Sequence, residues 1–89
     1  MNNHNTVVGM DVHKKMIVAA ALPPESDQIT QRLTIENHPQ AIERMVKRFA
    51  ASGSVEFVYE AGPCGYQVQR QIAGMGHPCA VIAPSLIII

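Results

Sequence analysis

The chain has 89 residues, enough for one small domain, and a domain of this size buries only about two-thirds of the surface that its unfolded chain exposes. Hydrophobic residues make up 47% of the sequence and charged residues 16%, which is typical of a packed globular piece and excludes a disordered tail. Seven Lys and Arg residues balance seven Asp and Glu residues, so net charge indicates no nucleic-acid partner, and any such role must come from a local site.

The longest unbroken apolar run, Met16 to Leu22, is too short to span a bilayer, and the polar start of the chain lacks the features of a signal peptide. We therefore expect a cytoplasmic protein with no membrane partner. Cys64 and Cys79 form no CxxC unit. Together with His77 they suggest at most a partial metal site with poor ligand spacing, and two small buried hydrophobic residues are the better interpretation.

Two apolar runs at the start of the chain predict a β-hairpin. Residues 6–12 have the pattern of a strand buried on both faces, and Asp11 is their one charged residue. Residues 16–22 form the second run, and prolines end it because they lack the amide that a sheet needs. The polar turn at residues 13–15 would join the two strands.

Residues 28–35 predict a third strand, because Ile29, Leu33 and Ile35 alternate onto one face. A helix should follow Asn37-His38-Pro39, where a capping residue precedes a proline that fits the first turn. Gly53 is its natural stop. The apolar residues at helical spacing are Ile42, Met45, Val46 and Phe49.

The rest of the chain alternates between strand and helix. Residues 55–60 resume strand character, residues 66–73 predict a short helix closed by Gly74 or Gly76, and residues 79–83 predict a fifth strand. No internal repeat or linker interrupts this order. It predicts an α/β fold with a mixed five-stranded sheet, flanking helices and right-handed crossovers, which is the order of an RNase H-like fold.

Asp11 and Glu60 are the candidate metal ligands. A carboxylate inside an apolar strand is costly to desolvate and should have a partner, although Asp11 could simply open the turn and Glu60 could be a solvated strand end. The predicted crossover pairs the fourth strand parallel to the first and brings the two carboxylates together. Because like charges repel, the pair is stable if one protonates or a hard cation such as Mg²⁺ lies between them.

Such carboxylates suit phosphodiester chemistry. Two divalent ions about 3.5 to 4 Å apart can hold the attacking and leaving oxygens of an in-line displacement. This is the chemistry of nucleases and transposases.

Three segments resemble the beginning of the DEDD-type transposases of the insertion sequence 110 family. They are residues 8–15 (VGMDVHKK), 58–66 (VYEAGPCGY) and 76–85 (GHPCAVIAPS), and together they extend over most of the chain. Each motif is weak alone, but their order and gaps are specific. The resemblance implies that residues 1–89 are the amino-terminal portion of a RuvC-like domain that binds Mg²⁺, or Mn²⁺, through four acids. Asp11 matches the first acid and Glu60 the second.

The resemblance also implies a role in DNA transposition and recombination, with DNA as partner, an element-encoded guide RNA, and a homo-oligomer at full length. No Asp follows Asp27 and no Glu follows Glu60, so the third and fourth acids are unmatched. We expect a fragment truncated at its carboxyl terminus and inactive alone, and the apolar residues 86–89 favour the same interpretation. The family's catalytic serine belongs to a separate domain, and that role is not assigned to Ser85.

Other residues allow two interpretations each. Lys14 and Lys15 could contact phosphates, or form a solvated hairpin tip. Gly9 and Gly62 could allow close approach of a phosphate, or mark a bulge and a turn. Tyr66 could stack on a base, or pack a helix.

Two other functions fit parts of the pattern. A nucleotide-binding module of the actin and sugar-kinase type also carries Gly-x-Asp in its opening strand, before a hairpin that binds phosphate. A noncatalytic relic could instead bind another protein through an exposed sheet edge.

Overall fold

The computed structural model describes residues 5–62 and 65–83. The predictions that concern Cys64, Ser85 and residues 86–89 lie outside the described residues. The elements are β1 (Thr6–Val12), β2 (Met16–Leu22), β3 (Gln31–Glu36), α1 (Pro39–Ala50), β4 (Val55–Glu60), α2 (Gln67–Gly74) and β5 (Cys79–Ile82). This succession confirms the predicted order of three strands, helix, strand, helix and strand.

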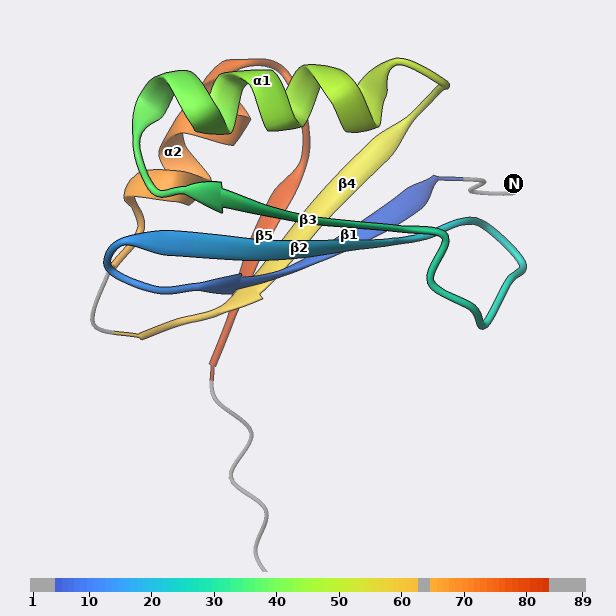
Figure 1. Cartoon of the computed structure of the whole chain (residues 1–89), viewed down its shortest axis with the longest axis horizontal. Helices are drawn as coiled ribbons and strands as arrows, with labels where there is room; N and C mark the ends of the chain where they lie inside the picture. Colours follow the sequence, from blue (N-terminus) through green and yellow to red (C-terminus); the bar gives the residue numbers. More distant parts are fainter. Residues whose placement is uncertain (1–4, 63–64, 84–89) are drawn as a thin grey trace, which may run out of the picture.

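The five strands form one mixed sheet in the order β3-β2-β1-β4-β5 (Figure 1). β1 and β2 pair antiparallel, as do β2 and β3, which confirms the predicted meander. β4 pairs parallel to β1, and β5 pairs parallel to β4. β1 therefore lies at the centre of the sheet, and the predicted parallel pairing of the first and fourth strands is confirmed.

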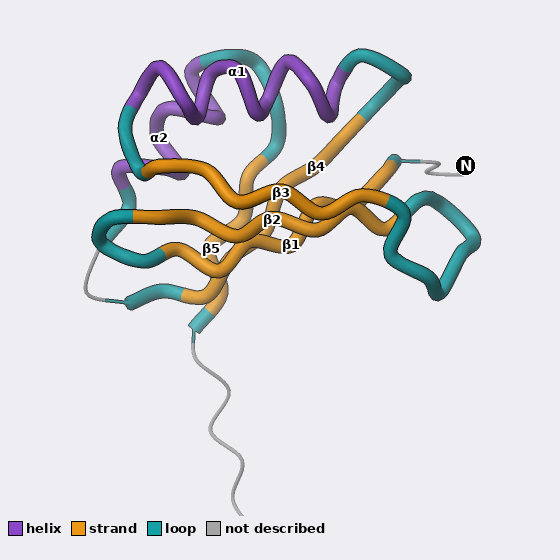
Figure 2. The backbone as a smooth tube through the Cα atoms, viewed as in Figure 1, coloured by secondary structure: helices purple, strands orange, loops and turns teal. Residues whose placement is uncertain are grey.

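Both helices lie on the same side of the sheet (Figure 2). Their apolar faces and the inward residues of the strands form one core, in which the Phe49 and Phe57 rings meet edge to face with centroids 6.4 Å apart. The fully buried side chains of the core are Val8, Ile17, Met45, Val46, Phe57 and Ile72. No helix in the described part of the chain is long and apolar enough to cross a membrane.

The prediction that the first strand is buried on both faces is wrong. Val8 and Met10 are buried in the core, whereas Val7 and Gly9 between them are only partly covered and Asp11 is exposed. The reason is that the described helices cover one face of the sheet and leave the other open. The apolar sequence of β1 alone could not distinguish a strand buried on both faces from a strand buried on one.

The third strand begins three residues later than predicted, at Gln31. Before it, the Gln28 amide donates to the Ser26 hydroxyl oxygen over 3.1 Å, a local turn that competes with strand pairing. Ile29 is 50% exposed and does not join the core face as expected.

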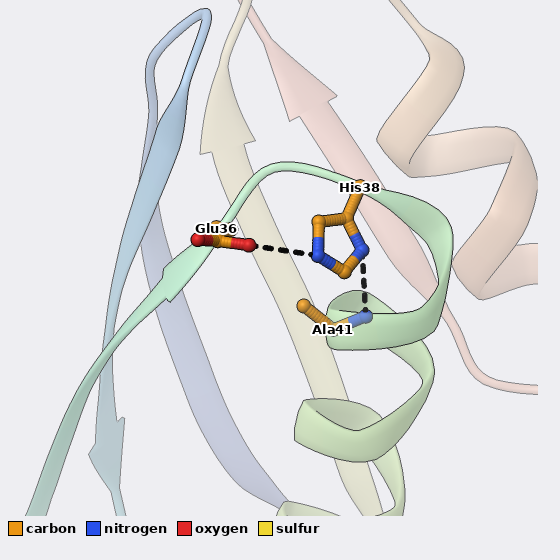
Figure 3. Close-up of polar contacts among 3 residues, drawn as sticks. All are labelled: Glu36, His38 and Ala41. Carbon is orange, nitrogen blue, oxygen red and sulfur yellow. Dashed lines mark hydrogen bonds and ion pairs between the residues drawn. The ribbon is translucent and has the colours of Figure 1, made fainter.

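The start of α1 also differs from the prediction, because His38 caps the helix and Asn37 does not (Figure 3). The Ala41 amide donates to Nδ1 of His38 over 3.3 Å, and Nε2 of the same ring lies 2.9 Å from Oε1 of Glu36. At the other end the helix stops at Ala50, and Gly53 adopts a φ of 145° just beyond it.

Candidate functional site

A shallow hollow of about 640 Å³ lies on the sheet face opposite the helices, where β1 and β4 end. Asp11 and Glu60 both contribute to its lining. The remaining lining residues that matter below are Gly9, Ala20, Arg32 and Val58.

The parallel pairing of β1 and β4 brings the two carboxylates to this hollow. Met10 pairs with Tyr59 in the register of the two strands, and both side chains are buried in the core. Successive side chains of a strand point to opposite faces. The next residues, Asp11 and Glu60, therefore both point away from the core, onto the open face and toward the same hollow.

Both carboxylates are solvated. The Asp11 side chain is 73% exposed, its Oδ2 atom lies 3.0 Å from Nε2 of His13, and Glu60 is also exposed. The inference that Asp11 needs a partner because it is desolvated is therefore wrong, since water can reach it on the open face.

The two side chains together are a partial ligand set for a hard cation. Carboxylate oxygens are the donors that Mg²⁺ prefers, and the ion keeps several waters when only one or two carboxylates bind it. Across residues 5–62 and 65–83, no three His, Cys, Asp or Glu side chains gather closely enough to hold a metal ion. The donor chemistry therefore fits weak binding by this part of the chain, with most of the coordination shell supplied from elsewhere.

Tyr59 links the end of β4 to Gly65 and to α2, a role that sequence reasoning missed. Its side chain is 3% exposed, and its hydroxyl donates to the Gly65 carbonyl over 3.2 Å. The same oxygen accepts from the Gln69 amide, 3.1 Å away, in the first turn of α2. An inward-facing tyrosine whose hydroxyl needs a partner was the available signal.

Lys14 and Lys15 lie in the exposed turn between β1 and β2, at the same end of β1 as Asp11. Asn37 ties this turn to the start of α1. Its Nδ2 donates to the His13 carbonyl over 2.8 Å, and its backbone amide donates to the Lys15 carbonyl over 3.0 Å. The two lysines therefore lie at the same end of the sheet as Asp11, and phosphate binding by them stays a prediction.

Cys79 is half-buried, and burial raises the pKa of its thiol to about 11. A thiol that holds its proton so firmly is a poor metal ligand, because the thiolate is the binding form. His77 packs its ring edge to face against Phe57, with centroids 6.3 Å apart. Both residues fit the interpretation of core packing. Tyr66, in contrast, is 51% exposed and does not pack into the helix interface.

A larger hollow, of about 730 Å³, lies between β3 and α1 and contains neither candidate ligand. Apolar side chains of Leu33, Ile35 and Met45 contribute to its lining, together with basic residues of α1. One of these, Lys47, forms an ion pair of 3.2 Å with Glu43. We take the smaller hollow as the candidate site because both carboxylates line it.

Nearly the whole chain is similar in sequence to two bacterial proteins. The y4qE protein of Sinorhizobium fredii (strain NBRC 101917 / NGR234), provisionally named a transposase, is 40% identical over 82 residues, which cover 90% of this chain and 21% of that protein. This chain is related to transposases. The transposase for insertion sequence element IS1533 of Leptospira borgpetersenii is 33% identical over 81 residues, or 90% of this chain and 23% of that protein.

The chain thus spans between a fifth and a quarter of the length of these relatives. No family model matches it. The relationship favours a transposase-related function over the nucleotide-binding alternative.

Proposed function

We propose that this chain forms the first part of the RuvC-like, RNase H-like catalytic domain of a DNA transposase of the insertion sequence 110 family. In this proposal Asp11 and Glu60 are the first two of the four DEDD acids. One observation carries it: the two carboxylates lie at the carboxyl ends of adjacent parallel strands and line one hollow, in a chain related to transposases.

The group that these residues would hold is Mg²⁺ or Mn²⁺, which stabilises the negative charge that develops during phosphodiester cleavage and strand transfer. The oxygens of Asp11 and Glu60 would bind the ion, and His13 would orient the Asp11 carboxylate through their 3.0 Å contact. Tyr59, the residue before Glu60, links the end of β4 to Gly65 and to α2 through its hydroxyl.

The third and fourth acids, and with them DNA cleavage, would require chain beyond these 89 residues. We expect the chain alone to bind the metal weakly and to leave DNA uncut. A guide RNA, a homo-oligomer and a cytoplasmic location belong to the same proposal for the full-length protein.

Paramagnetic broadening by Mn²⁺ in amide NMR spectra tests the proposed metal site. Signals of residues next to Asp11 and Glu60 should broaden first, and Asp11→Asn or Glu60→Gln should remove most of this effect. Asp27→Asn is the matched control, because Asp27 is an exposed carboxylate in the β2–β3 loop, which follows the end of β2 that pairs with the start of β1. Broadening that survives in both site variants, or that is lost equally in Asp27→Asn, would contradict the proposal.

A further inference from the structure

Arg32 lies at one end of a row of small side chains that crosses the open face of the sheet. Arg32 of β3 pairs with Ala20 of β2, and Ala20 pairs with Gly9 of β1. Gly9 pairs in turn with Val58 of β4. Partners in register point to the same face, so all four residues lie on the open side. All four also line the hollow that contains Asp11 and Glu60.

The two residues at the middle of this row, Gly9 and Ala20, have the smallest side chains and leave the most space above the sheet. A Cβ atom added to Gly9 would meet no atom within 4 Å, and the adjacent Ala20 carries only a methyl group. Asp11 lies two residues along β1 from Gly9 and therefore on the same face. Strands are about 4.8 Å apart, so the backbone of Arg32 lies about 10 Å across the sheet from that of Gly9. A ligand over Gly9 would thus lie between the guanidinium and the carboxylates.

The charged side chains of the hollow are separated across the sheet, with the carboxylates on β1 and β4 and the guanidinium on β3. Its described lining holds three charged side chains, namely Asp11, Glu60 and Arg32. Arg32 is exposed, and no ion pair within the described part of the chain involves it. Guanidinium is permanently charged, and its forked donors match the oxygens of a phosphate.

A nucleic-acid strand entering this hollow faces a specific difficulty. A divalent ion at Asp11 and Glu60 would balance the charge of those two carboxylates, and the successive phosphates of a strand lying over the hollow would still repel one another. A cation a short distance along the face would offset this repulsion. Arg32 is the cation that the described lining offers.

We propose that Arg32 binds a phosphodiester group of the DNA strand next to the one held at Asp11 and Glu60. The strand backbone would pass over Gly9 and Ala20, where the floor leaves room for it. This inference rests on the proposed function, because it assigns a second phosphate contact to the same site. Arg32 is a binding residue in this scheme and takes no part in proton or phosphoryl transfer.

The test is binding of a short fluorescent single-stranded DNA, followed by anisotropy in Mg²⁺ at several salt concentrations. Loss of one phosphate contact should lower the slope of log K against log salt by about 0.7 for a single strand. Arg32→Gln should show this change, with an affinity roughly two- to five-fold lower at moderate salt. Arg70→Gln is the matched control, because Arg70 is an exposed arginine on α2, on the helix-covered side of the sheet. It should leave both quantities unchanged.

A second variant tests the floor of the row without altering charge. Gly9→Val should keep the fold, because the added side chain meets open space and valine favours strands, yet it should weaken DNA binding several-fold by filling the path of the backbone. An unchanged salt slope in Arg32→Gln, an equal effect of Arg70→Gln, or no measurable DNA binding by the wild type would each overturn the proposal.

Mn²⁺ broadening in the same variants separates the two proposals. If Arg32→Gln binds DNA normally while broadening near Asp11 persists in the wild type, the role of Arg32 fails and the metal site stands. If the wild type shows no broadening but loses DNA affinity on Arg32→Gln, the metal site fails and the phosphate contact stands.

Discussion

Replacing His38 with alanine should destabilise the fold through the first turn of α1. His38 supplies the side-chain acceptor that satisfies the Ala41 amide, over 3.3 Å, and the helix itself cannot pair that amide. Because Nδ1 accepts there, Nε2 carries the ring hydrogen and donates to Glu36 over 2.9 Å, so the carboxylate selects the tautomer that can cap. Pro39 at the first helical position adds a preset φ but no capping atom.

The expected loss is about 1 kcal/mol, the usual cost of removing an N-cap side chain. For a domain of this size, that corresponds to a decrease of about 4 to 8 °C in the midpoint of thermal unfolding. Circular dichroism during heating and during urea titration measures both quantities. His38→Asn should retain most of the stability, because asparagine is a preferred capping residue.

Gln40→Ala is the matched control, since Gln40 is an exposed residue of the same turn. The capping role of His38 would be refuted if His38→Ala unfolded at the wild-type midpoint. It would also be refuted if His38→Asn lost as much stability as His38→Ala.

Three further predictions concern Tyr59, Cys79 and Asn37. Tyr59→Phe should cost about 1 to 3 kcal/mol, because the Gln69 amide loses its partner, and hydrogen exchange at Gln69 should become faster; exchange at the wild-type rate would show that the hydroxyl does not hold α2. Cys79 should react with iodoacetamide at pH 8 about a hundredfold more slowly than a cysteine of pKa 9.0, and its rate should rise from pH 9 to 11 as the thiolate forms. Mass spectrometry of the labelled peptide measures this rate, and labelling as fast as that of a cysteine of pKa 9.0 would contradict the prediction. Asn37→Ala should speed hydrogen exchange in the β1–β2 turn with little loss of global stability, because it removes an exposed bond to the His13 carbonyl; unchanged exchange in this turn would mean that the bond does not restrain it.

Local patterns were sufficient to predict the order of the elements and the parallel pairing of β1 and β4. Apolar runs, prolines and glycines act over a few residues, and the handedness of crossovers then leaves few topologies. This is why the sequence could bring Asp11 and Glu60 to one end of the sheet. Their role as metal ligands stays a prediction that the fold alone does not test.

The remaining features depend on contacts between distant segments. Whether Asp11 is buried depends on which face the helices cover, and the apolar character of β1 is compatible with either arrangement. The position of Arg32 in the hollow could not be predicted, because it depends on the register between β3 and β2, which no single segment determines. The capping role of His38 was missed because histidine is uncommon at that position, and Asn37 next to it is the more usual choice.

The central position of β1 has a consequence for the time course of synthesis. Thr6 pairs with Val55. β1 leaves the ribosome first, and the edge that does not pair with β2 stays unpaired until β4 has been synthesised. Pairing between such distant segments is slow to form because the long intervening loop must close first. The nascent β1–β2–β3 meander therefore spends that interval without β4 at the free edge of β1, and Asp11 and Glu60 come to line the same hollow only once β4 has paired there.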